Sequence, residues 1–298
     1  MGRRGLWTGK HLRAISRQLA QLELRVCPNT VRRLLEHLGY ALQANRKSLC
    51  ASNPHRDQQF RYLTCHRRQF SHNGYPIISV DTKKKELVGQ FKNNGRLWCR
   101  EPILVQDHDF RSQAQGLAIP YGIYDLQANR GFVVVGTSHD TPSFAVEALC
   151  QWWRRQGCHR YPGAPELLIL ADDGGSNGSR CRAWKLALQE KLVDRYQMAV
   201  TVCHYPAGAS KWNPVEHRLF SEISKNWAGQ PLIDYSTILR LIVTTRTQTG
   251  LAVRCALDTT YYPTKVKIAP AQMNQLDLFK HPFLPQLNYT LFPRTNRN

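Results

Sequence analysis

The stretch LLILADDGGSNG, residues 167–178, constrains the fold of this chain more than any other segment. A short aliphatic run bounded by glycines is typical of a strand that is buried on both faces of a sheet. Asp172 and Asp173 follow the carboxyl end of that strand, which is where open α/β sheets place their ligands. Three interpretations compete for this loop: a metal site, a serine nucleophile elbow and an ordinary polar turn.

Short apolar segments and helical patterns alternate around this strand. Strands are expected at 76–81, 119–125, 131–137, 167–171 and 199–205, and helices at 142–156, 180–195 and from near Asn213. The LQANRG link between the second and third strands favours a hairpin, because Asn and Gly tolerate positive φ. The order βββαβαβα is the one that the α/β ribonuclease-H-like fold uses, although other α/β folds share the spacing.

The first fifty residues are denser in basic side chains than the remainder and show two helical patterns. Apolar residues recur at helical spacing at Leu12, Ile15 and Leu19. A second helix is expected to begin at Pro28 and to end at Gly39, since proline is favoured in a first turn and glycine just past a last one. Two short helices with Arg32 and Arg33 on the outer face of the second are typical of a helix-turn-helix, and also of other basic hairpins.

These patterns predict four parts of the chain. We expect a helix-turn-helix DNA-binding segment at 1–50, a helical connector at 51–75, an α/β catalytic core at 76–230 and a C-terminal extension at 231–298.

The net charge of +20 favours a polyanionic partner, most simply nucleic acid. No segment approaches the ~20 apolar residues that a membrane span needs, and the N-terminus lacks the apolar region of a signal peptide. The nine cysteines are odd in number and lack CxxC spacing, which argues against a disulfide framework and a zinc ribbon. We therefore expect a cytoplasmic protein without a membrane partner.

Three acidic residues fall at the ends of elements that the predicted topology brings together: Asp81, Asp172 and Glu216. Grouping carboxylates is costly, because each negative charge raises the pKa of its neighbours. Divalent cations relieve that cost, and carboxylate oxygens suit Mg²⁺ or Mn²⁺. Two such ions can activate an attacking oxygen and stabilise a leaving one in phosphodiester displacement. A basic chain around an acidic metal site therefore indicates an enzyme that processes DNA.

Each acid also has a purely structural interpretation. Asp81, in VDTKKKE, fits a turn at the end of a strand, and Asp172 fits a polar loop. Asn213, Pro214 and Glu216 match a capping box, in which the glutamate folds back onto the helix start. The metal interpretation is favoured because it accounts for all three acids together.

Residues 174–178, GGSNG, also match the G-x-S-x-G of a nucleophile elbow, with Ser176 as the nucleophile. Asp194 or Asp234, and then His281, follow in the chain order of a hydrolase triad. Two aspartates nevertheless separate the strand from the serine, and no HGGG-type oxyanion loop is present. A serine hydrolase is therefore the weaker alternative.

Four longer segments are similar to the ISAzo13-type DDE transposases of bacterial insertion sequences: VDTKKKELVGQFKNNGRLW, PYGIYDLQANRGFVVVGTSHDT, LADDGGSNGSR and NPVEHRLFSEISKNW. The similarity extends from about Trp7 to the closing LNYTLFP. It implies a ribonuclease-H-like core that cuts and joins DNA at transposon ends, using two Mg²⁺ or Mn²⁺ ions held by Asp81, Asp172 and Glu216. The second motif of the family is an aspartate followed by glycines, so Asp173 is the alternative to Asp172.

The resemblance also implies double-stranded DNA as the partner, a homo-oligomer during synapsis and a location at the bacterial nucleoid. Basic residues are the candidates for phosphate contacts: Arg32, Arg33, Arg46, Lys47, Lys83, Lys84, Lys85 and Lys211. Family members usually carry further sequence before the TGKHLR-like segment, so we expect the DNA-binding segment to be incomplete. The main alternative to an active transposase is therefore a decayed copy that binds DNA without cutting it.

Overall fold

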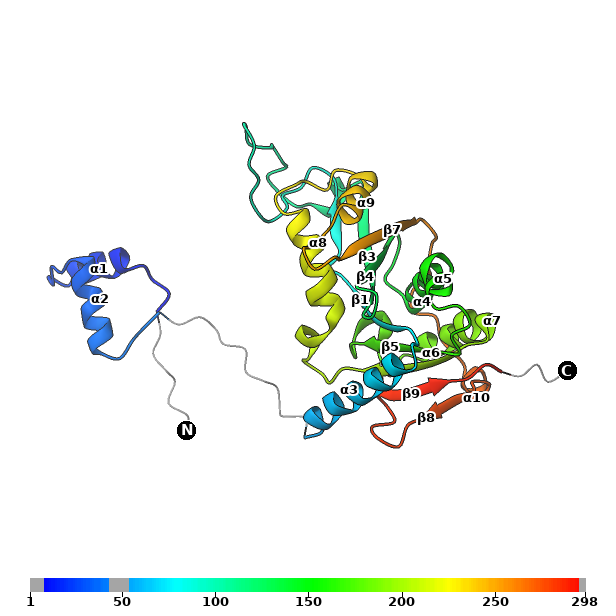
Figure 1. Cartoon of the computed structure of the whole chain (residues 1–298). Coiled ribbons are helices and arrows are strands. Elements are labelled where there is room, and N and C mark those ends of the chain that lie inside the picture. Colours follow the sequence, from blue (N-terminus) through cyan, green and yellow to red (C-terminus); the bar gives the residue numbers. More distant parts are fainter. Residues whose placement is uncertain (1–7, 43–53, 295–298) are drawn as a thin grey trace. The chain divides into compact units, whose positions relative to one another are not determined.

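The computed structural model describes residues 8–42 and 54–294 and divides into two compact units (Figure 1). The first is Met1–Cys50 and the second is Ala51–Asn298.

The first unit contains two helices that pack against each other, α1 (Leu12–Gln21) and α2 (Pro28–His37). Proline stands at the first position of α2, and Gly39, just past its end, has a φ of +81°. Both expected helices are therefore present. Only Val31 is buried in them, because a pair of short helices cannot enclose a larger apolar face.

The second unit is built on a nine-stranded sheet. Its strands are β1 (Ile77–Thr82), β2 (Glu86–Val88), β3 (Gly116–Asp125), β4 (Arg130–Gly136), β5 (Glu166–Ala171), β6 (Ala199–His204), β7 (Ala252–Asp258), β8 (Leu278–Lys280) and β9 (Asn288–Leu291). The order is β7-β4-β3-β1-β5-β6-β9-β8, with β2 paired to β3. Strands β1, β5 and β6 are parallel, and β3 is antiparallel to both β1 and β4. Along the chain, β1, β3, β4, β5 and β6 correspond to the five predicted strands, and β3 and β4 form the expected antiparallel hairpin.

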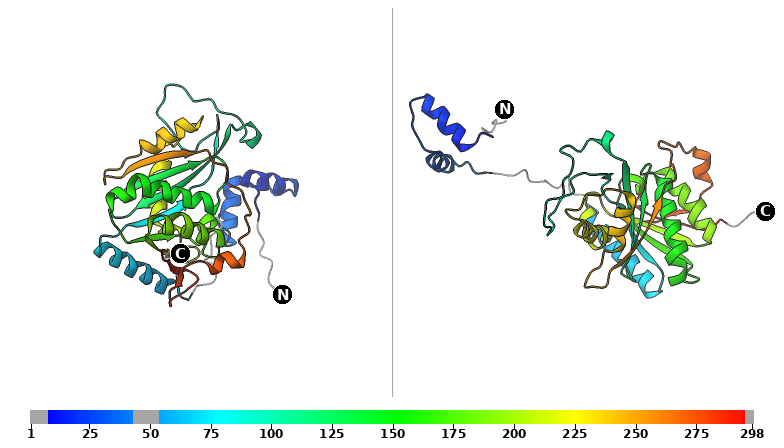
Figure 2. Two further views of the ribbon diagram at one scale, coloured as in Figure 1. Left: turned by 90° about the vertical axis from the view of Figure 1, so that its right-hand side faces the viewer. Right: turned by 90° about the horizontal axis from the view of Figure 1, so that it is seen from above.

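Helices cover both faces of the sheet (Figure 2). The helices of this unit are α3 (Arg56–His72), α4 (Pro142–Trp152), α5 (Cys158–Arg160), α6 (Arg182–Leu188), α7 (Asp194–Tyr196), α8 (Ser221–Asn226), α9 (Tyr235–Val243) and α10 (Pro270–Asn274). Three π-helical turns continue them: Trp153–Gly157 between α4 and α5, Gln189–Val193 between α6 and α7, and Glu216–Phe220 before α8. Helices α4 and α6 share a core with one face, while α3, α8 and α9 contribute to cores on the other.

The aliphatic run of β5 is buried on both sides, as the sequence predicted. Leu167 and Ile169 pack in the core shared with α4 and α6, whereas Leu168 and Leu170 pack against α3. Successive side chains of a strand point to opposite faces, so a strand covered on both faces needs an uninterrupted apolar run. This packing holds the carboxyl end of β5 rigidly.

Residues 231–298 are more than an extension of the core. Strand β7 pairs parallel with β4 at one side of the sheet, while β9 pairs antiparallel with β6 and carries β8 at the other. Strands β8 and β9 have only three and four residues, and the seven residues of β7 mix apolar with polar side chains, so these strands left little signal in the sequence. No helix of the described residues is long and apolar enough to span a lipid bilayer.

Candidate active site

The register of the sheet places Asp81 and Asp172 next to each other. Strands β1 and β5 are parallel neighbours in which Val80 pairs with Ala171. Asp81 is the next residue of β1, and Asp172 directly follows β5. Neighbouring strands lie about 4.8 Å apart, so the two carboxylates share the carboxyl edge of the sheet.

Glu216 approaches the same edge from the helical segment that leads into α8. Its carboxyl group lies close enough to that of Asp81 for each to shift the pKa of the other. The segment packs closely on β3 because Gly122, the residue paired with Asp81, has no side chain, and a Cβ there would collide with the ring of Phe220. The structure thus brings together the three acids that the sequence singled out.

A buried asparagine fixes Glu216 opposite Asp81. The side-chain oxygen of Asn213 accepts a hydrogen bond from the hydroxyl of Ser79, in β1, and its amide nitrogen lies 3.5 Å from Asp81 Oδ2. The backbone N–H of Val215 donates to Ser79 Oγ over 3.0 Å. The Asn213 side chain is therefore used to join the helix to the strand, and the Glu216 side chain is directed to Asp81 rather than to the helix start.

Burial and mutual repulsion oppose ionisation of this cluster. Burial, and then the charge of Asp172, raise the pKa of Asp81 to about 8. Burial raises the pKa of Asp172 to about 6 and also raises the pKa of Glu216 above its ordinary value. The three groups would carry full negative charge at neutral pH only if a countercharge were supplied.

The donor set suits a hard divalent cation. Asp172 Oδ1 is buried and has no hydrogen-bond partner among the described residues, which is costly for a carboxylate oxygen and leaves it available as a ligand. As the side chains stand, no group of three or more His, Cys, Asp or Glu within residues 8–42 and 54–294 is arranged to hold a metal ion.

The two adjacent aspartates have different surroundings. Asp173 is exposed, and its Oδ1 accepts the backbone N–H of Ser179 over 2.9 Å, which fixes the loop. Asp172 is partly buried and is close enough to Asp81 for each charge to disfavour the other. The geometry therefore favours Asp172 over Asp173 as a partner of the other acids.

Two supporting residues were missed in the sequence. His204, at the end of β6, is buried, and its Nδ1 donates to the carbonyl oxygen of Asp172 over 2.9 Å. Burial lowers the pKa of His204 to about 4, so the ring is neutral. Asp140, before α4, accepts a hydrogen bond from the Thr82 hydroxyl over 3.2 Å, and its charge also raises the pKa of Asp172. Asp140 lies in the segment PYGIYDLQANRGFVVVGTSHDT, and its only sequence signal was the family resemblance of that segment. The only sequence signal for His204 was its position at the end of a predicted strand.

The three consecutive lysines after β1 differ in exposure. Lys83 is buried, with Nζ 3.0 Å from Glu86 Oε1 and 4.3 Å from the ring centroid of Trp227. Lys84 and Lys85 are exposed. Lys83 is thus bound internally, and Lys84 and Lys85 are better placed for the expected phosphate contacts.

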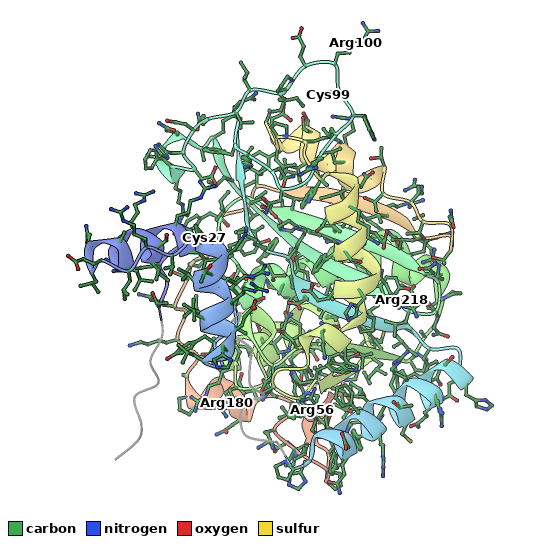
Figure 3. The ribbon with its side chains drawn as sticks, turned by 90° about the vertical axis from the view of Figure 1, so that its left-hand side faces the viewer. Cys27, Arg56, Cys99, Arg100, Arg180 and Arg218 are labelled. Carbon is green, nitrogen blue, oxygen red and sulfur yellow. The ribbon has the colours of Figure 1, made fainter. Side chains whose placement is uncertain are left out.

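Two basic side chains lie against the ring of Trp212, the residue before Asn213. The Nζ of Lys211 lies 3.9 Å from the ring centroid of Trp212, and the guanidinium of Arg56 lies 5.2 Å from the same ring. Trp212 is 45% exposed, so this face is open to a ligand. Arg218, two residues beyond Glu216, is also exposed; Figure 3 labels it together with Arg56.

The remaining basic candidates belong to the N-terminal part of the chain. Arg32 and Arg33 are exposed on α2, and Arg32 Nε lies 3.5 Å from Glu36 Oε1. Arg46 and Lys47 lie outside the described residues.

The structure does not assemble a serine triad. Ser176 is buried, and its hydroxyl contacts Asn177 at 3.5 Å. Asp194 forms an ion pair with an arginine, Asp234 caps α9, and His281 is hydrogen-bonded to a tyrosine and a threonine. No histidine in the described part of the chain is hydrogen-bonded to Ser176, so the nucleophile-elbow interpretation is wrong.

Comparison with known proteins gives one family match over nearly the whole sequence. The ISAzo13-type family described as the Rhodopirellula transposase DDE domain matches residues 3–293. Among solved structures, the chain is similar to the Mos1 transposase paired-end complex with left transposon end (TM-score 0.42) and to the Mos1 strand transfer complex (TM-score 0.45). Each comparison has 15% identity and covers 80% of this chain and 72% of the other. No curated protein matches the chain.

Proposed function

The chain belongs to the ISAzo13-type family of transposase DDE domains, and on that premise we propose that it cuts and joins DNA at the ends of an insertion sequence. The observation that carries the proposal is the meeting of Asp81, Asp172 and Glu216 at one edge of the sheet. A cluster of acids that resists ionisation, inside a chain of net charge +20, suits metal-dependent work on a polyanion.

Asp81, Asp172 and Glu216 would hold the divalent cations, Mg²⁺ or Mn²⁺. Two bound cations would supply charge neutralisation and polarise the oxygens of water and phosphate. Asn213 keeps Glu216 facing Asp81, and the neutral ring of His204 holds the backbone of Asp172. These contacts hold in place the backbone segments that carry the acids, while the carboxyl groups themselves would still have to turn toward a bound cation.

The reaction has two phosphoryl-transfer steps. In the first, a water oxygen forms a bond to phosphorus while the P–O3′ bond breaks, which leaves a 3′-hydroxyl and a 5′-phosphate. In the second, that hydroxyl attacks a phosphodiester of the target DNA, and the displaced oxygen leaves as a new 3′-hydroxyl. The exposed Lys84, Lys85 and Lys211 would hold the DNA strand beside the acids through its phosphates.

Recognition of the element ends is assigned to the N-terminal helices. Helices α1 and α2 would form part of a helix-turn-helix, with the exposed Arg32 and Arg33 contacting DNA. Two ends must be held together before they are joined, so we propose a homo-oligomer during synapsis. We expect the cutting and joining of DNA by this protein to take place at the bacterial nucleoid.

Nicking of supercoiled plasmid in Mg²⁺ or Mn²⁺ tests the proposal. We expect the wild-type chain to nick and Asp172→Asn to abolish nicking. Asp173→Asn is the matched control, because an asparagine oxygen can still accept the N–H of Ser179 and keep the loop in place. Equal activity of wild type and Asp172→Asn would contradict the assignment of this acid.

The second candidate function is DNA binding without cleavage by a decayed copy. The observation in its favour is that the net charge of +20 and the exposed Arg32 and Arg33 on α2 suit DNA binding whether or not the acids cut. It predicts that the wild type and Asp172→Asn bind DNA equally and that neither nicks it. Metal-dependent nicking that Asp172→Asn abolishes would exclude this alternative.

A further inference from the structure

A pocket of ≈ 580 Å³ lies at the edge of the sheet opposite to the acids, lined by residues of β4, of β7 and of the α4–α5 segment. It surrounds the start of β4, where Arg130 pairs with Asp125 on one side and with Ala252 on the other. Asp125 in turn pairs with Ile78, at the amino end of β1, whereas Asp81 stands at the carboxyl end. The pocket is therefore separate from the candidate active site.

The charged residues that line this pocket are all basic or titratable to a cation. They are Arg130, Arg155, His159, Arg160, Arg246 and Arg254. No Asp or Glu of the described chain is among its lining residues. Five guanidinium groups around one hollow repel one another, and a bound anion would relieve that repulsion.

Contacts within the protein account for only part of this charge. Arg160 forms an ion pair with Asp125 at 3.4 Å, and Arg130 donates to the carbonyl oxygen of Gly250 over 2.7 Å. Within the described residues, Arg155 and Arg254 have neither an ion pair nor a side-chain hydrogen bond. Both are exposed, so two fork-shaped donors remain available to a ligand.

Gln156 provides a second and independent indication of a ligand. This residue lines the pocket, is only 7% exposed, and has a buried Nε2 without a hydrogen-bond partner in the described structure. A buried N–H without an acceptor costs free energy, so Gln156 would gain from a side-chain movement that brings Nε2 to an acceptor in the pocket. Gln156 lies in the π-helical turn Trp153–Gly157, and such turns are frequent at functional sites.

We propose that this arginine pocket binds the phosphate backbone of double-stranded DNA as a second DNA site. The choice of DNA as the partner rests on the proposed function. A guanidinium group can donate two hydrogen bonds to the oxygens of one phosphate. Phosphate contacts do not depend on the base sequence, so such a site suits target or flanking DNA.

The extent of the basic surface favours a polymer over a single small anion. A neighbouring pocket of ≈ 460 Å³ shares Arg155 and adds Arg154 and Lys191 to the basic groups on this side. It also contains Glu147 and Asp258, but Glu147 is paired with Arg154 at 3.0 Å, and Asp258 accepts from the Tyr262 hydroxyl over 2.8 Å. The two hollows share Arg155, so the basic groups that line them extend beyond a single pocket.

Protection of individual arginines from an arginine-selective dicarbonyl reagent, mapped by mass spectrometry, tests the proposal. The full chain is treated with the reagent in the presence of a metal chelator, so that cleavage cannot consume the DNA. One sample contains a duplex of unrelated sequence, and a second contains inorganic phosphate at the same phosphate concentration. We expect the duplex to protect Arg155 and Arg254 several-fold more than Arg68, an exposed arginine of α3 that lines neither pocket. Protection no greater than that of Arg68, or equal protection by inorganic phosphate, would overturn the proposal.

The salt dependence of duplex binding gives a second measure. Each phosphate contact contributes about 0.9 to the slope of log K against log salt, so Arg155→Ala with Arg254→Ala should lower the slope by about 1.8. Arg68→Ala is the matched control, and an unchanged slope in the double variant would also overturn the proposal. Nicking without protection would refute only this second site, whereas protection without nicking would refute only the proposed catalysis.

Discussion

Ser79 donates a hydrogen bond to the side-chain oxygen of Asn213, 134 residues further along the chain. Both side chains are fully buried, and the same serine oxygen accepts the N–H of Val215 at the start of the segment that carries Glu216. The pair therefore sets the distance between β1, with Asp81, and Glu216. It acts on the site by positioning the acids.

The stability losses from removing the two partners of this pair should not add. We expect Asn213→Ala to lower the free energy of unfolding by about 1–3 kcal/mol, because it leaves the Ser79 hydroxyl buried without its acceptor. The double variant Ser79→Ala with Asn213→Ala should lose less than the sum of the single variants. Denaturant unfolding of the four proteins measures this coupling, and strictly additive losses would contradict it.

Divalent cations should stabilise the folded chain through Asp172. A ligand that binds only the native state at 100 times its Kd adds about 2.7 kcal/mol to the free energy of unfolding. We therefore expect Mn²⁺ to raise the melting temperature of the wild type and to have much less effect on Asp172→Asn. Asp173→Asn should respond as the wild type does, since that side chain holds the loop. An equal response of all three proteins would place the cation elsewhere.

The stability of the C-terminal edge should depend on pH through His281. Its Nδ1 lies 2.6 Å from the hydroxyl of Tyr62, whose pKa is raised by burial to about 12, so the tyrosine donates and the imidazole accepts. Burial, and then the neighbouring His66, lower the pKa of His281. The unfolded chain consequently binds this proton more readily than the folded one, and the stabilisation that is present above about pH 6.5 is lost as the pH falls.

A comparison of wild type with His281→Gln isolates this contribution. The difference in the free energy of unfolding between the two proteins should shrink between pH 7.5 and pH 5. A difference that stays constant over this range would show that the ring does not titrate in the expected direction. Tyr62 remains protonated throughout, so its own ionisation does not enter.

The sequence predicted those structural features that depend on a single segment of the chain. The run before Asp172 had to be a doubly buried strand, and the alternation of strands and helices then brought Asp81, Asp172 and Glu216 to one edge. The sequence did not predict which side chains from distant segments form hydrogen bonds with each other. Asn213 was equally suited to a helix cap, and only the position of Ser79 decided its role. The outer strands β7, β8 and β9 take their pairing from the sheet rather than from their own sequence pattern.

The lysine run after β1 provides a matched pair of variants. Lys83 is only 9% exposed and pairs with Glu86, whereas Lys84 is exposed and has no ion pair within the described residues. Lys83→Met keeps most of the apolar side chain over Trp227 but leaves the carboxylate of Glu86 without its cation. We expect it to lower the free energy of unfolding by about 1–3 kcal/mol, because a half-buried charge loses its partner.

Lys84→Met should leave the free energy of unfolding unchanged and weaken DNA binding, unlike Lys83→Met. Loss of one phosphate contact reduces the salt slope of binding by about 0.9, and the effect should be the same for every DNA sequence. Denaturant unfolding and duplex binding at several salt concentrations separate the two variants. If Lys83→Met instead weakened DNA binding while leaving stability intact, Lys83 would have to leave Glu86 and turn outward when DNA is bound. The lysine run would then be a single phosphate-binding unit, as the sequence first suggested.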